Sequence, residues 1–301
     1  MIEKHIPVLL SEVVEQLKIK ENGIYVDLTL GRAGHSKEIL KKLTTGKLIC
    51  FDKDNQALLE SNEILKNINS NFTLIHSDFR YLSNELKKLG ITKVDGILAD
   101  LGVSSPQLDD KSRGFSYSQN SPLDMRMDLS NSLTASEVIN TFSEDEIEKI
   151  LIENADVKFA KQVAKAIVKA RPINDSFSLN EIIKNALPAK IVREKNPSKA
   201  IFQALRIKVN DELNALADLL SQVANVLNKD GKLLVITFHS KEDAIVKKYF
   251  QKLNYKDPKL NRLPVNETKM WHQKIIYPTD KEIEQNRRSR SAKLRVITKL
   301  E

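Results

Sequence analysis

The sequence has few of the residues that disulfides, metal clusters and membrane spans require. Its one cysteine, Cys50, excludes an internal disulfide and a cysteine-based zinc cluster. No apolar run approaches the roughly 18 residues that span a bilayer. Charged side chains interrupt residues 1–17, where a secretory signal needs an unbroken apolar core. We therefore expect a cytoplasmic protein with no membrane partner and no bound metal.

Composition and charge describe a globular chain with an excess of positive charge. A hydrophobic content of 41% with 29% charged residues is typical of soluble domains, and 301 residues suffice for one large domain or two ordinary ones. The formal net charge of +8 favours a polyanionic partner. Many basic proteins bind no nucleic acid, so the charge by itself is a weak signal.

Glycine is also scarce, yet two of the nine glycines, Gly31 and Gly34, lie within four residues. They follow a short β-branched run and precede a helix-like run. Glycine lets the backbone approach a ligand, and the helix N-terminus offers free N–H groups. An ordinary strand-turn-helix connection would explain the glycines. Asp52 weakens that alternative, because a carboxylate at the end of the next strand can accept hydrogen bonds from both ribose hydroxyls.

The glycine spacing also separates two classes of cofactor. A dinucleotide fingerprint needs G-x-G-x-x-G, in which the second glycine admits the pyrophosphate. Residues 31–34 read Gly-Arg-Ala-Gly and lack that glycine. S-adenosylmethionine has no phosphate and needs only a cradle for its adenosine and amino-acid parts. The pattern Asp-x-x-x-Gly-x-x-Gly therefore favours S-adenosylmethionine over a nicotinamide dinucleotide.

Strand-like runs alternate with helical segments, which predicts a parallel sheet covered by helices. The runs are residues 24–30, 47–51, 72–76, 94–100 and 232–238. In such sheets ligands bind beyond the carboxyl ends of the strands. Gly31, Asp52, Asp78, Phe79 and Asp100 all fall at those ends. Asp78 could instead cap a helix and Phe79 could fill the core.

The alternation stops between Asp100 and Lys232. Residues 101–133 lack periodicity, and three capping boxes follow, beginning at Thr134, Ser143 and Ser178. We expect an all-helical substrate-recognition domain at residues 106–197. It would be inserted into a discontinuous sheet domain formed by residues 1–105 and 198–301, which resumes with a long helix near 198–227.

Two basic segments are candidates for contacts with RNA phosphates. Lysines recur at helical spacing, and arginines mix with hydroxyl side chains near the end of the chain. A solvent-exposed helix face that binds nothing is the commoner explanation of such a stripe of lysines. The second basic segment makes phosphate contacts a stronger alternative to it. The residues concerned are Lys158, Lys161, Lys165, Lys169, Arg287, Arg288 and Arg290. The terminal segment is expected to enter a final strand near residues 292–296.

Long ordered motifs show a resemblance to a known family. They occupy residues 5–10, 100–110, 113–115, 122–128, 202–213, 238–243 and 288–295. The chain resembles the bacterial small-subunit (16S) ribosomal RNA cytosine-N4 methyltransferases, or MraW methylases. The resemblance implies a class I, Rossmann-like, S-adenosylmethionine-dependent methyltransferase domain interrupted by a helical domain. Its expected substrate is a cytosine in the decoding region of small-subunit ribosomal RNA, presented as free RNA or as a ribosomal particle.

Carried over residue by residue, the resemblance implies a set of cofactor contacts. They are Ala33, Gly34, His35, Asp52, Phe79, Asp100 and Gln107. The chain departs from the family pattern at three places: Ala33 replaces a frequent glycine, Asn196 begins an Asn-Pro-Ser in place of the more usual His-Pro-Ala, and Arg287 replaces a common proline.

The residues also bear on which atom accepts the methyl group. Methylation of cytosine at C5 needs a cysteine nucleophile that adds covalently to the ring. Cys50 lies on a strand that cannot supply it. An exocyclic amino group needs only acceptors and alignment. Ser104 and Ser105, before a proline, partly match the Asp/Ser-Pro-Pro-aromatic motif of amino-methylases that act on DNA. His239 could accept a proton, contact the base or be structural, and Asp100 could face the cofactor amino group or the target nitrogen.

Two other classes of function compete with this interpretation. A nicotinamide oxidoreductase would share the sheet and Asp52, but it would need the missing glycine and a hydride-transfer site. A non-catalytic RNA-binding protein would explain the basic segments but not a full set of strand-end residues.

Overall fold

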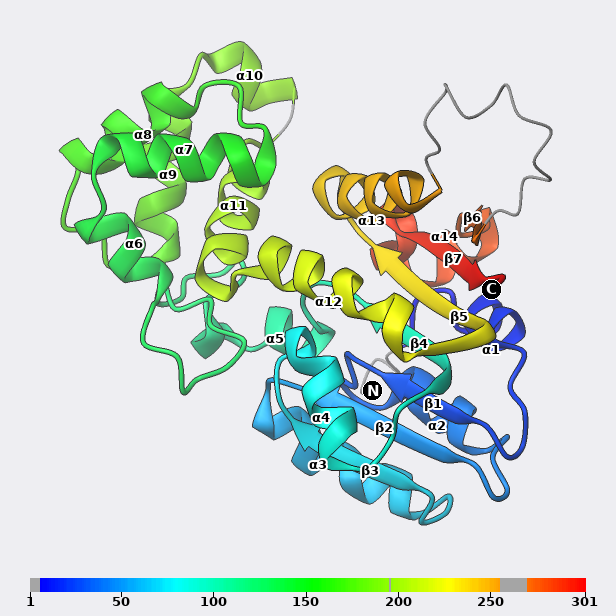
Figure 1. Cartoon of the computed structure of the whole chain (residues 1–301). Coiled ribbons are helices and arrows are strands. Elements are labelled where there is room, and N and C mark those ends of the chain that lie inside the picture. The colour runs from blue at the N-terminus through cyan, green and yellow to red at the C-terminus, as the bar shows by residue number, and fades with distance from the viewer. Residues whose placement is uncertain (1–5, 195, 255–269) are drawn as a thin grey trace, which may run out of the picture. The chain divides into compact units, whose positions relative to one another are not determined.

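The computed structural model describes residues 6–194, 196–254 and 270–301, which fall into two compact units (Figure 1). The sheet unit comprises residues 1–102 and 214–301, and the helical unit comprises residues 103–213. Within the described residues, no helix is long and apolar enough to cross a membrane.

The sheet unit is built on a seven-stranded sheet with the order β3-β2-β1-β4-β5-β7-β6. Its parallel strands are β1 (Ile24–Asp27), β2 (Lys47–Asp52), β3 (Phe72–His76), β4 (Val94–Asp100) and β5 (Leu227–Thr237). Two antiparallel strands, β7 (Lys293–Lys299) and β6 (Trp271–Ile276), complete it. The predicted α/β, Rossmann-like class is confirmed. β6 was not predicted, because as an edge strand it has mostly solvent-accessible side chains and no clear alternation.

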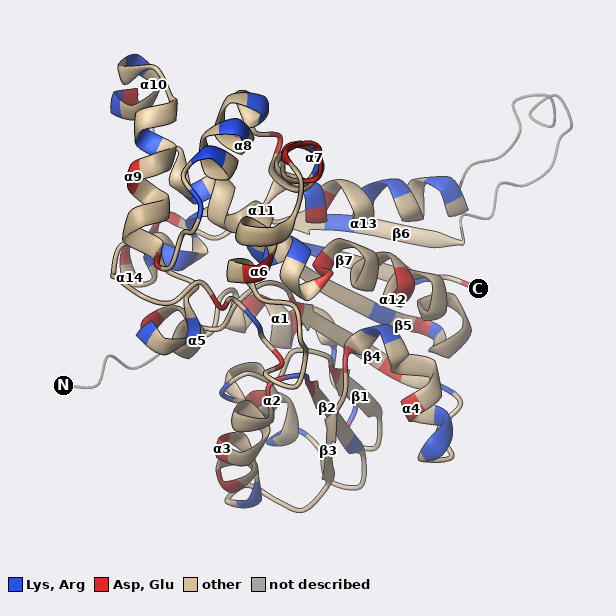
Figure 2. Cartoon of the chain, turned by 90° about the vertical axis from the view of Figure 1, so that its left-hand side faces the viewer, with Lys and Arg blue, Asp and Glu red and all other residues tan. Residues whose placement is uncertain are grey.

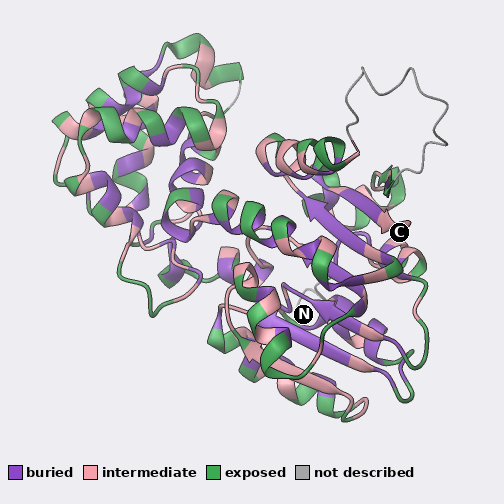
Figure 3. Cartoon of the chain, in the orientation of Figure 1, coloured by how far each residue is buried: buried purple, intermediate pink, exposed green. Residues whose placement is uncertain are grey.

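Helices cover both faces of this sheet. They are α1 (Leu10–Leu17), α2 (Gly34–Leu40), α3 (Asn55–Lys66), α4 (Leu82–Lys88), α12 (Glu212–Val226), α13 (Ser240–Leu253) and α14 (Asp280–Gln285), with short 3₁₀ turns η1 (Phe79–Tyr81) and η4 (Arg287–Ser291). Successive strand residues enter different cores. Leu48 and Cys50 pack in one cluster, and Ile49 and Phe51 in the other. Figure 3 shows the central strands as mostly buried.

The helical unit has its own apolar core. Its elements are α5 (Ser105–Asp109), η2 (Lys111–Arg113), α6 (Ala135–Thr141), α7 (Glu144–Ala155), α8 (Ala160–Lys169), α9 (Ser176–Ala186), α10 (Ala189–Glu194) and α11 (Ser198–Asn210). The sequence placed α11 in the sheet domain. Its buried side chains Ile201, Phe202 and Leu205 instead belong to the core of the helical unit, so the compact units divide at residue 213 rather than 197.

Side-chain caps start several helices of this unit, among them α6, α7 and α9. Thr134 and Ser143 accept the predicted backbone hydrogen bonds at α6 and α7. The box predicted at Ser178 is wrong. Asp175 is the N-cap of α9 and accepts from the Ser178 amide at 2.9 Å, because a carboxylate three residues upstream satisfies the same free N–H group. At the start of α11, the Asn196 side chain accepts from the Ser198 amide at 3.1 Å, which gives this departure from the family a structural role.

The long segment before α6 is held by side chains rather than by regular structure. Asn210 Oδ1 accepts from the Met127 amide at 2.7 Å, and Asn210 Nδ2 donates to the Met125 carbonyl at 2.7 Å. Gly114 has φ +72, and a Cβ there would lie 2.2 Å from the Pro122 carbonyl oxygen. Two of the motifs that carry the family resemblance therefore include residues that fix this segment.

Candidate active site

The turn between β1 and α2 places residues with little or no side chain at the carboxyl edge of the sheet. Gly31 has φ +49, and its amide donates to Asp52 Oδ2 at 2.8 Å. Ala33 is buried, caps α2 and has φ +55, in the left-handed region that favours glycine. This conformation gives a physical reason why glycine is frequent at that position in the family.

Asp52 lies at the end of β2, as predicted, and binds the backbone through both oxygens. Besides the Gly31 bond, Asp52 Oδ1 accepts from the Asp54 amide at 2.9 Å. Burial nevertheless raises the pKa of Asp52 to about 6. A carboxylate has about four acceptor sites, so two remain for ligand hydroxyls.

Asp27, at the end of β1, is the acidic residue of the Asp-x-x-x-Gly-x-x-Gly pattern, although it was not among the predicted site residues. Its carboxylate is 1% exposed and accepts from the Thr29 amide at 3.1 Å and the Ser36 hydroxyl at 2.7 Å. Burial raises its pKa despite these bonds. An acidic residue directly before a glycine turn was the available signal. Asp27 holds the turn to the start of α2.

Asp100, at the end of β4, is next to His35. Asp100 Oδ2 lies 3.9 Å from His35 Nδ1, while Asp100 Oδ1 is buried and has no hydrogen-bond partner among the described residues. Burial raises the pKa of Asp100 to about 8, and Asp27 and Glu242 add to the effect. His35 is 5% exposed, and its Nε2 lies 2.9 Å from the Val8 carbonyl oxygen.

Three carboxyl groups lie at the ends of the neighbouring strands β1, β2 and β4. Burial raises the pKa of Asp27, Asp52 and Asp100, and none of the three forms an ion pair with a lysine or arginine in the described part of the chain. A buried acid without a countercharge favours its protonated form unless a positive ligand arrives. These hydrogen-bond acceptors therefore fit a ligand that has hydroxyl groups and positive charge.

His239 sits after β5, where it caps α13. The Glu242 amide approaches His239 Nδ1 at 3.5 Å, and His239 Nε2 lies 3.1 Å from Glu242 Oε1 without the alignment of a hydrogen bond. Glu242 is 2% exposed and accepts from the Phe238 amide at 2.8 Å. This arrangement corresponds to the structural role that the sequence left open for His239.

Asp78 and Phe79 follow β3. Asp78 Oδ1 accepts from the Arg80 amide at 3.0 Å and caps η1, and its other oxygen lies 3.6 Å from Lys53 Nζ. Phe79 is half-buried against the core of the sheet unit. Both therefore have the structural roles that were considered for them, at the strand end where a ligand is expected.

Ser104, Ser105 and Gln107 belong to the helical unit. Ser104 caps α5 in a capping box: its Oγ lies 3.4 Å from the Gln107 amide, and Gln107 Oε1 accepts from the Ser104 amide at 3.0 Å. Ser105 and Gln107 are both 8% exposed. The sequence did not anticipate that Gln107 and Ser104 bind each other.

The predicted basic residues are exposed. Figure 2 marks lysine and arginine positions along the ribbon in blue. On α8 the buried side chains are Val163, Ala164 and Ile167. The exposed cations are Lys158, Lys161, Lys165, Lys169, Arg287, Arg288 and Arg290. Arg295 differs, because it is 4% exposed and its Nε donates to Asp243 Oδ1 at 2.6 Å. Its role is structural.

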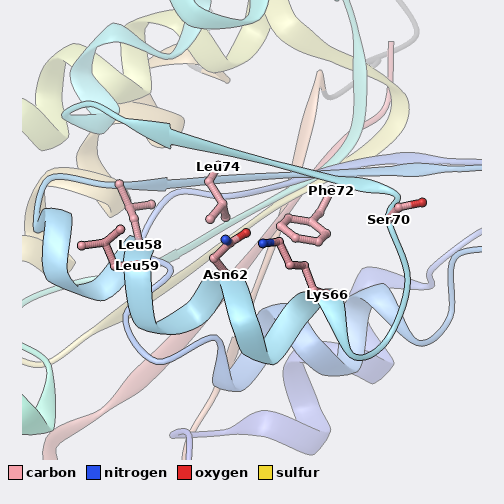
Figure 4. Close-up of a pocket in the computed structure, with 7 residues that line it drawn as sticks. All are labelled: Leu58, Leu59, Asn62, Lys66, Ser70, Phe72 and Leu74. Atoms are coloured by element: carbon pink, nitrogen blue, oxygen red, sulfur yellow. The ribbon is translucent and has the colours of Figure 1, made fainter.

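A surface pocket of about 440 Å³ lies elsewhere on the sheet unit (Figure 4). Side chains of α3 and β3 form most of its wall: Leu58, Leu59, Asn62, Lys66, Ser70, Phe72 and Leu74. None of the candidate site residues lines it. Its lining is mostly apolar and carries no carboxylate.

A model of the MraW methylase family matches residues 2–300 of the chain. The chain belongs to the MraW methylase family. It is 66% identical over 284 residues to the ribosomal RNA small subunit methyltransferase H of Metamycoplasma arthritidis, with 94% of this chain and 99% of that protein covered. The protein of the same name from Mycoplasmopsis agalactiae is 54% identical over 300 residues, and all of both chains is covered. A solved rRNA methylase from Streptococcus thermophilus is 11% identical, with a TM-score of 0.47, and the match covers 99% of this chain and 100% of that one.

Family membership confirms the resemblance on which the sequence analysis relied, and it decides against an oxidoreductase and a non-catalytic binding protein. The cofactor is S-adenosylmethionine, as predicted. Its sulfonium and ammonium groups are positive and its ribose carries two hydroxyls. The acidic edge of the sheet, with the unpartnered Asp100 oxygen, fits such a ligand.

Proposed function

We propose that the protein methylates the exocyclic N4 amino group of a cytosine in the decoding region of small-subunit ribosomal RNA. Two relatives, at 66% and 54% identity over nearly the whole chain, are named small-subunit ribosomal RNA methyltransferases. This similarity supports the same class of substrate, small-subunit ribosomal RNA, for the present chain. The choice of base, atom and region is the finer part of the proposal.

The burial of Cys50 is the observation that carries the choice of N4 over C5. Its side chain is fully buried in β2, its Sγ lies 3.4 Å from the Ser36 hydroxyl, and burial raises the pKa of the thiol. A C5 methylase needs an accessible thiolate to add to the ring. Cys50 meets neither condition. An amino group needs no covalent adduct, and the family resemblance selects cytosine over adenine.

On this proposal the site residues divide between cofactor and target. The 33–35 turn supplies backbone, Asp52 accepts from the ribose hydroxyls, and Phe79 and Gln107 complete the cofactor contacts. Asp100 holds the cofactor ammonium group or the target nitrogen. Bound S-adenosylmethionine supplies a methyl group activated by its sulfonium.

The target nitrogen must be aligned and must lose a proton. With S-adenosylmethionine bound, the nitrogen lone pair would take up the methyl group and S-adenosylhomocysteine would leave. Ser104 and Ser105 would accept hydrogen bonds from the amino group, with the target nucleotide extruded from its stack. His239 is the candidate to receive the proton or to contact the base. The exposed cations that would bind RNA phosphates are Lys158, Lys161, Lys165, Lys169, Arg287, Arg288 and Arg290.

Methyl transfer from labelled S-adenosylmethionine tests the proposal. Naked small-subunit ribosomal RNA, an assembly precursor and the mature subunit serve as substrates, followed by digestion to nucleosides and mass spectrometry. We expect label in N4-methylcytidine. Label in 5-methylcytidine or N6-methyladenosine would overturn the choice of atom, and full activity of the Ser104→Ala, Ser105→Ala double variant would remove both serines from the mechanism.

A further inference from the structure

Residues 6–9, which we call the N-terminal strap, contact the proposed cofactor turn on one side. Val8 presents its carbonyl oxygen 2.9 Å from His35 Nε2, and a carbonyl can only accept, so Nε2 carries the proton. Pro7 lies against Gly34 so closely that a Cβ at Gly34 would be 2.3 Å from Pro7 Cγ. His5, the first residue of this family motif, lies outside the described residues.

Two residues near the other end of the chain hold the opposite side of the strap. Glu282 of α14 accepts from the Leu9 amide at 2.7 Å through Oε1. Asn286, which precedes η4, donates from Nδ2 to the Ile6 carbonyl at 2.9 Å. These partners are 273 and 280 residues apart in the sequence, so neither bond arises from local structure.

The strap needs such support because part of its backbone is strained. Leu9 is fully buried and has φ +54, a conformation that L-residues other than Asn and Asp rarely adopt. The Glu282 bond is made to the amide of this same residue. Its carboxylate is therefore placed to keep the Leu9 backbone, and the Val8 carbonyl before it, in position.

The strap in turn sets the orientation of His35. The bond from Nε2 to Val8 fixes the plane of the ring and places Nδ1 3.9 Å from Asp100 Oδ2. Loss of the hydrogen bond to Val8 would remove one of the contacts that hold the ring beside Asp100.

We propose that Glu282 and Asn286 are positioning residues for the methyl-donor site, acting through the strap on Gly34 and His35. The inference rests on the proposed cofactor contacts of His35 and Asp100. Neither Glu282 nor Asn286 touches those contacts, and nothing in the pattern around them marks a cofactor role. Their effect on the cofactor is indirect and is transmitted by the backbone of residues 6–9.

Calorimetric titration of the full chain with S-adenosylhomocysteine tests this without RNA. Glu282→Ala should weaken binding about tenfold, the scale of one charge-assisted hydrogen bond. Glu282→Gln keeps an oxygen that can accept from Leu9 and should bind within about threefold of the parent. Glu284→Ala, at an exposed position on the same helix, is the matched control and should bind as the parent does.

A merely structural role predicts a different result. Glu282→Ala would then lower the melting temperature and leave the dissociation constant of the folded fraction unchanged, which would overturn the proposal. Binding by Glu282→Gln as weak as that of the alanine variant would also overturn it, because charge rather than the hydrogen bond would be responsible.

If Glu282→Ala does not fold, Asn286→Asp replaces it. This variant keeps the oxygen that accepts from the Arg288 amide at 3.2 Å and removes only the donor to Ile6. We expect weaker binding of S-adenosylhomocysteine, and parental binding would refute the role of Asn286. Failure of the proposed cofactor contacts is recognised separately, by parental binding in Asp100→Asn and His35→Ala, and failure of the proposed function by the nucleoside analysis above.

Discussion

If Asp100 holds the cofactor ammonium group, affinity for S-adenosylmethionine should rise with pH, because the carboxyl must ionise to pair with that cation. The pKa of Asp100 is raised to about 8 by burial and by Asp27 and Glu242. A bound ammonium group favours the carboxylate, so binding lowers that pKa and releases a proton. The ionised fraction is roughly 1% at pH 6 and about half at pH 8. The dissociation constant should therefore be roughly 50-fold larger at pH 6 than at pH 8.

Titration calorimetry across this pH range, in two buffers of different ionisation enthalpy, measures both the affinity and the proton release. Asp100→Asn should bind more weakly at pH 8 and lose most of the pH dependence, with a residual inflection near pH 6 from Asp52, whose pKa is about 6. Glu63→Gln, at a side chain that is 75% exposed, is the control. A parental pH profile in Asp100→Asn would refute the assignment of the titrating group.

Four further predictions concern particular residues of the structure. Asp52→Ala removes two charge-assisted bonds to ribose, each worth roughly 1.5–3 kcal/mol, and should weaken S-adenosylmethionine binding by about 100-fold or more in calorimetry; unchanged affinity would discard the ribose assignment. Replacing Lys161, Lys165 and Lys169 by Gln should flatten the salt dependence of RNA filter binding by about 0.7–0.9 for each phosphate that is no longer neutralised, and a parental slope would mean a solvated face. Ala33→Gly relieves a φ of +55 and should raise the free energy of unfolding by up to about 1 kcal/mol in urea titrations, because about 1–2 kcal/mol of strain outweighs the added freedom of the unfolded chain. Burial raises the pKa values of Asp52 and Asp100, so between about pH 4 and pH 8 the folded state binds more protons than the unfolded state. The free energy of unfolding should therefore fall as pH rises over this range, by at most about 1.4 kcal/mol per pH unit for each group. Constant stability would contradict this.

The sequence predicted the parts of the fold that depend on local pattern. Buried parallel strands read as apolar runs, and their order along the chain places Asp52 and Asp100 at one edge. Thr134 and Ser143 were correct caps because a cap bonds within its own first turn. These features need no knowledge of distant contacts.

The remaining features depend on tertiary contacts that one sequence does not display. The apolar face of α11 fits either unit, and only its packing with α7 decides between them. Glu282 looks like any exposed helical glutamate until Leu9 lies beside it. The raised pKa of Asp100 follows from burial and from Asp27 and Glu242, which three different elements bring together.

The position of the helical unit in the chain has a consequence for folding. β4 and β5 are neighbours in the sheet, yet residues 101–226 separate them in the sequence. Closing so long a loop in an unfolded chain costs conformational entropy, about 0.6 kcal/mol for each doubling of length. The helical unit has its own core and is built from nearby helices, and such local contacts form quickly. Folding of this unit first would shorten the effective loop, so the strand that carries Asp100 would gain its partner β5 late.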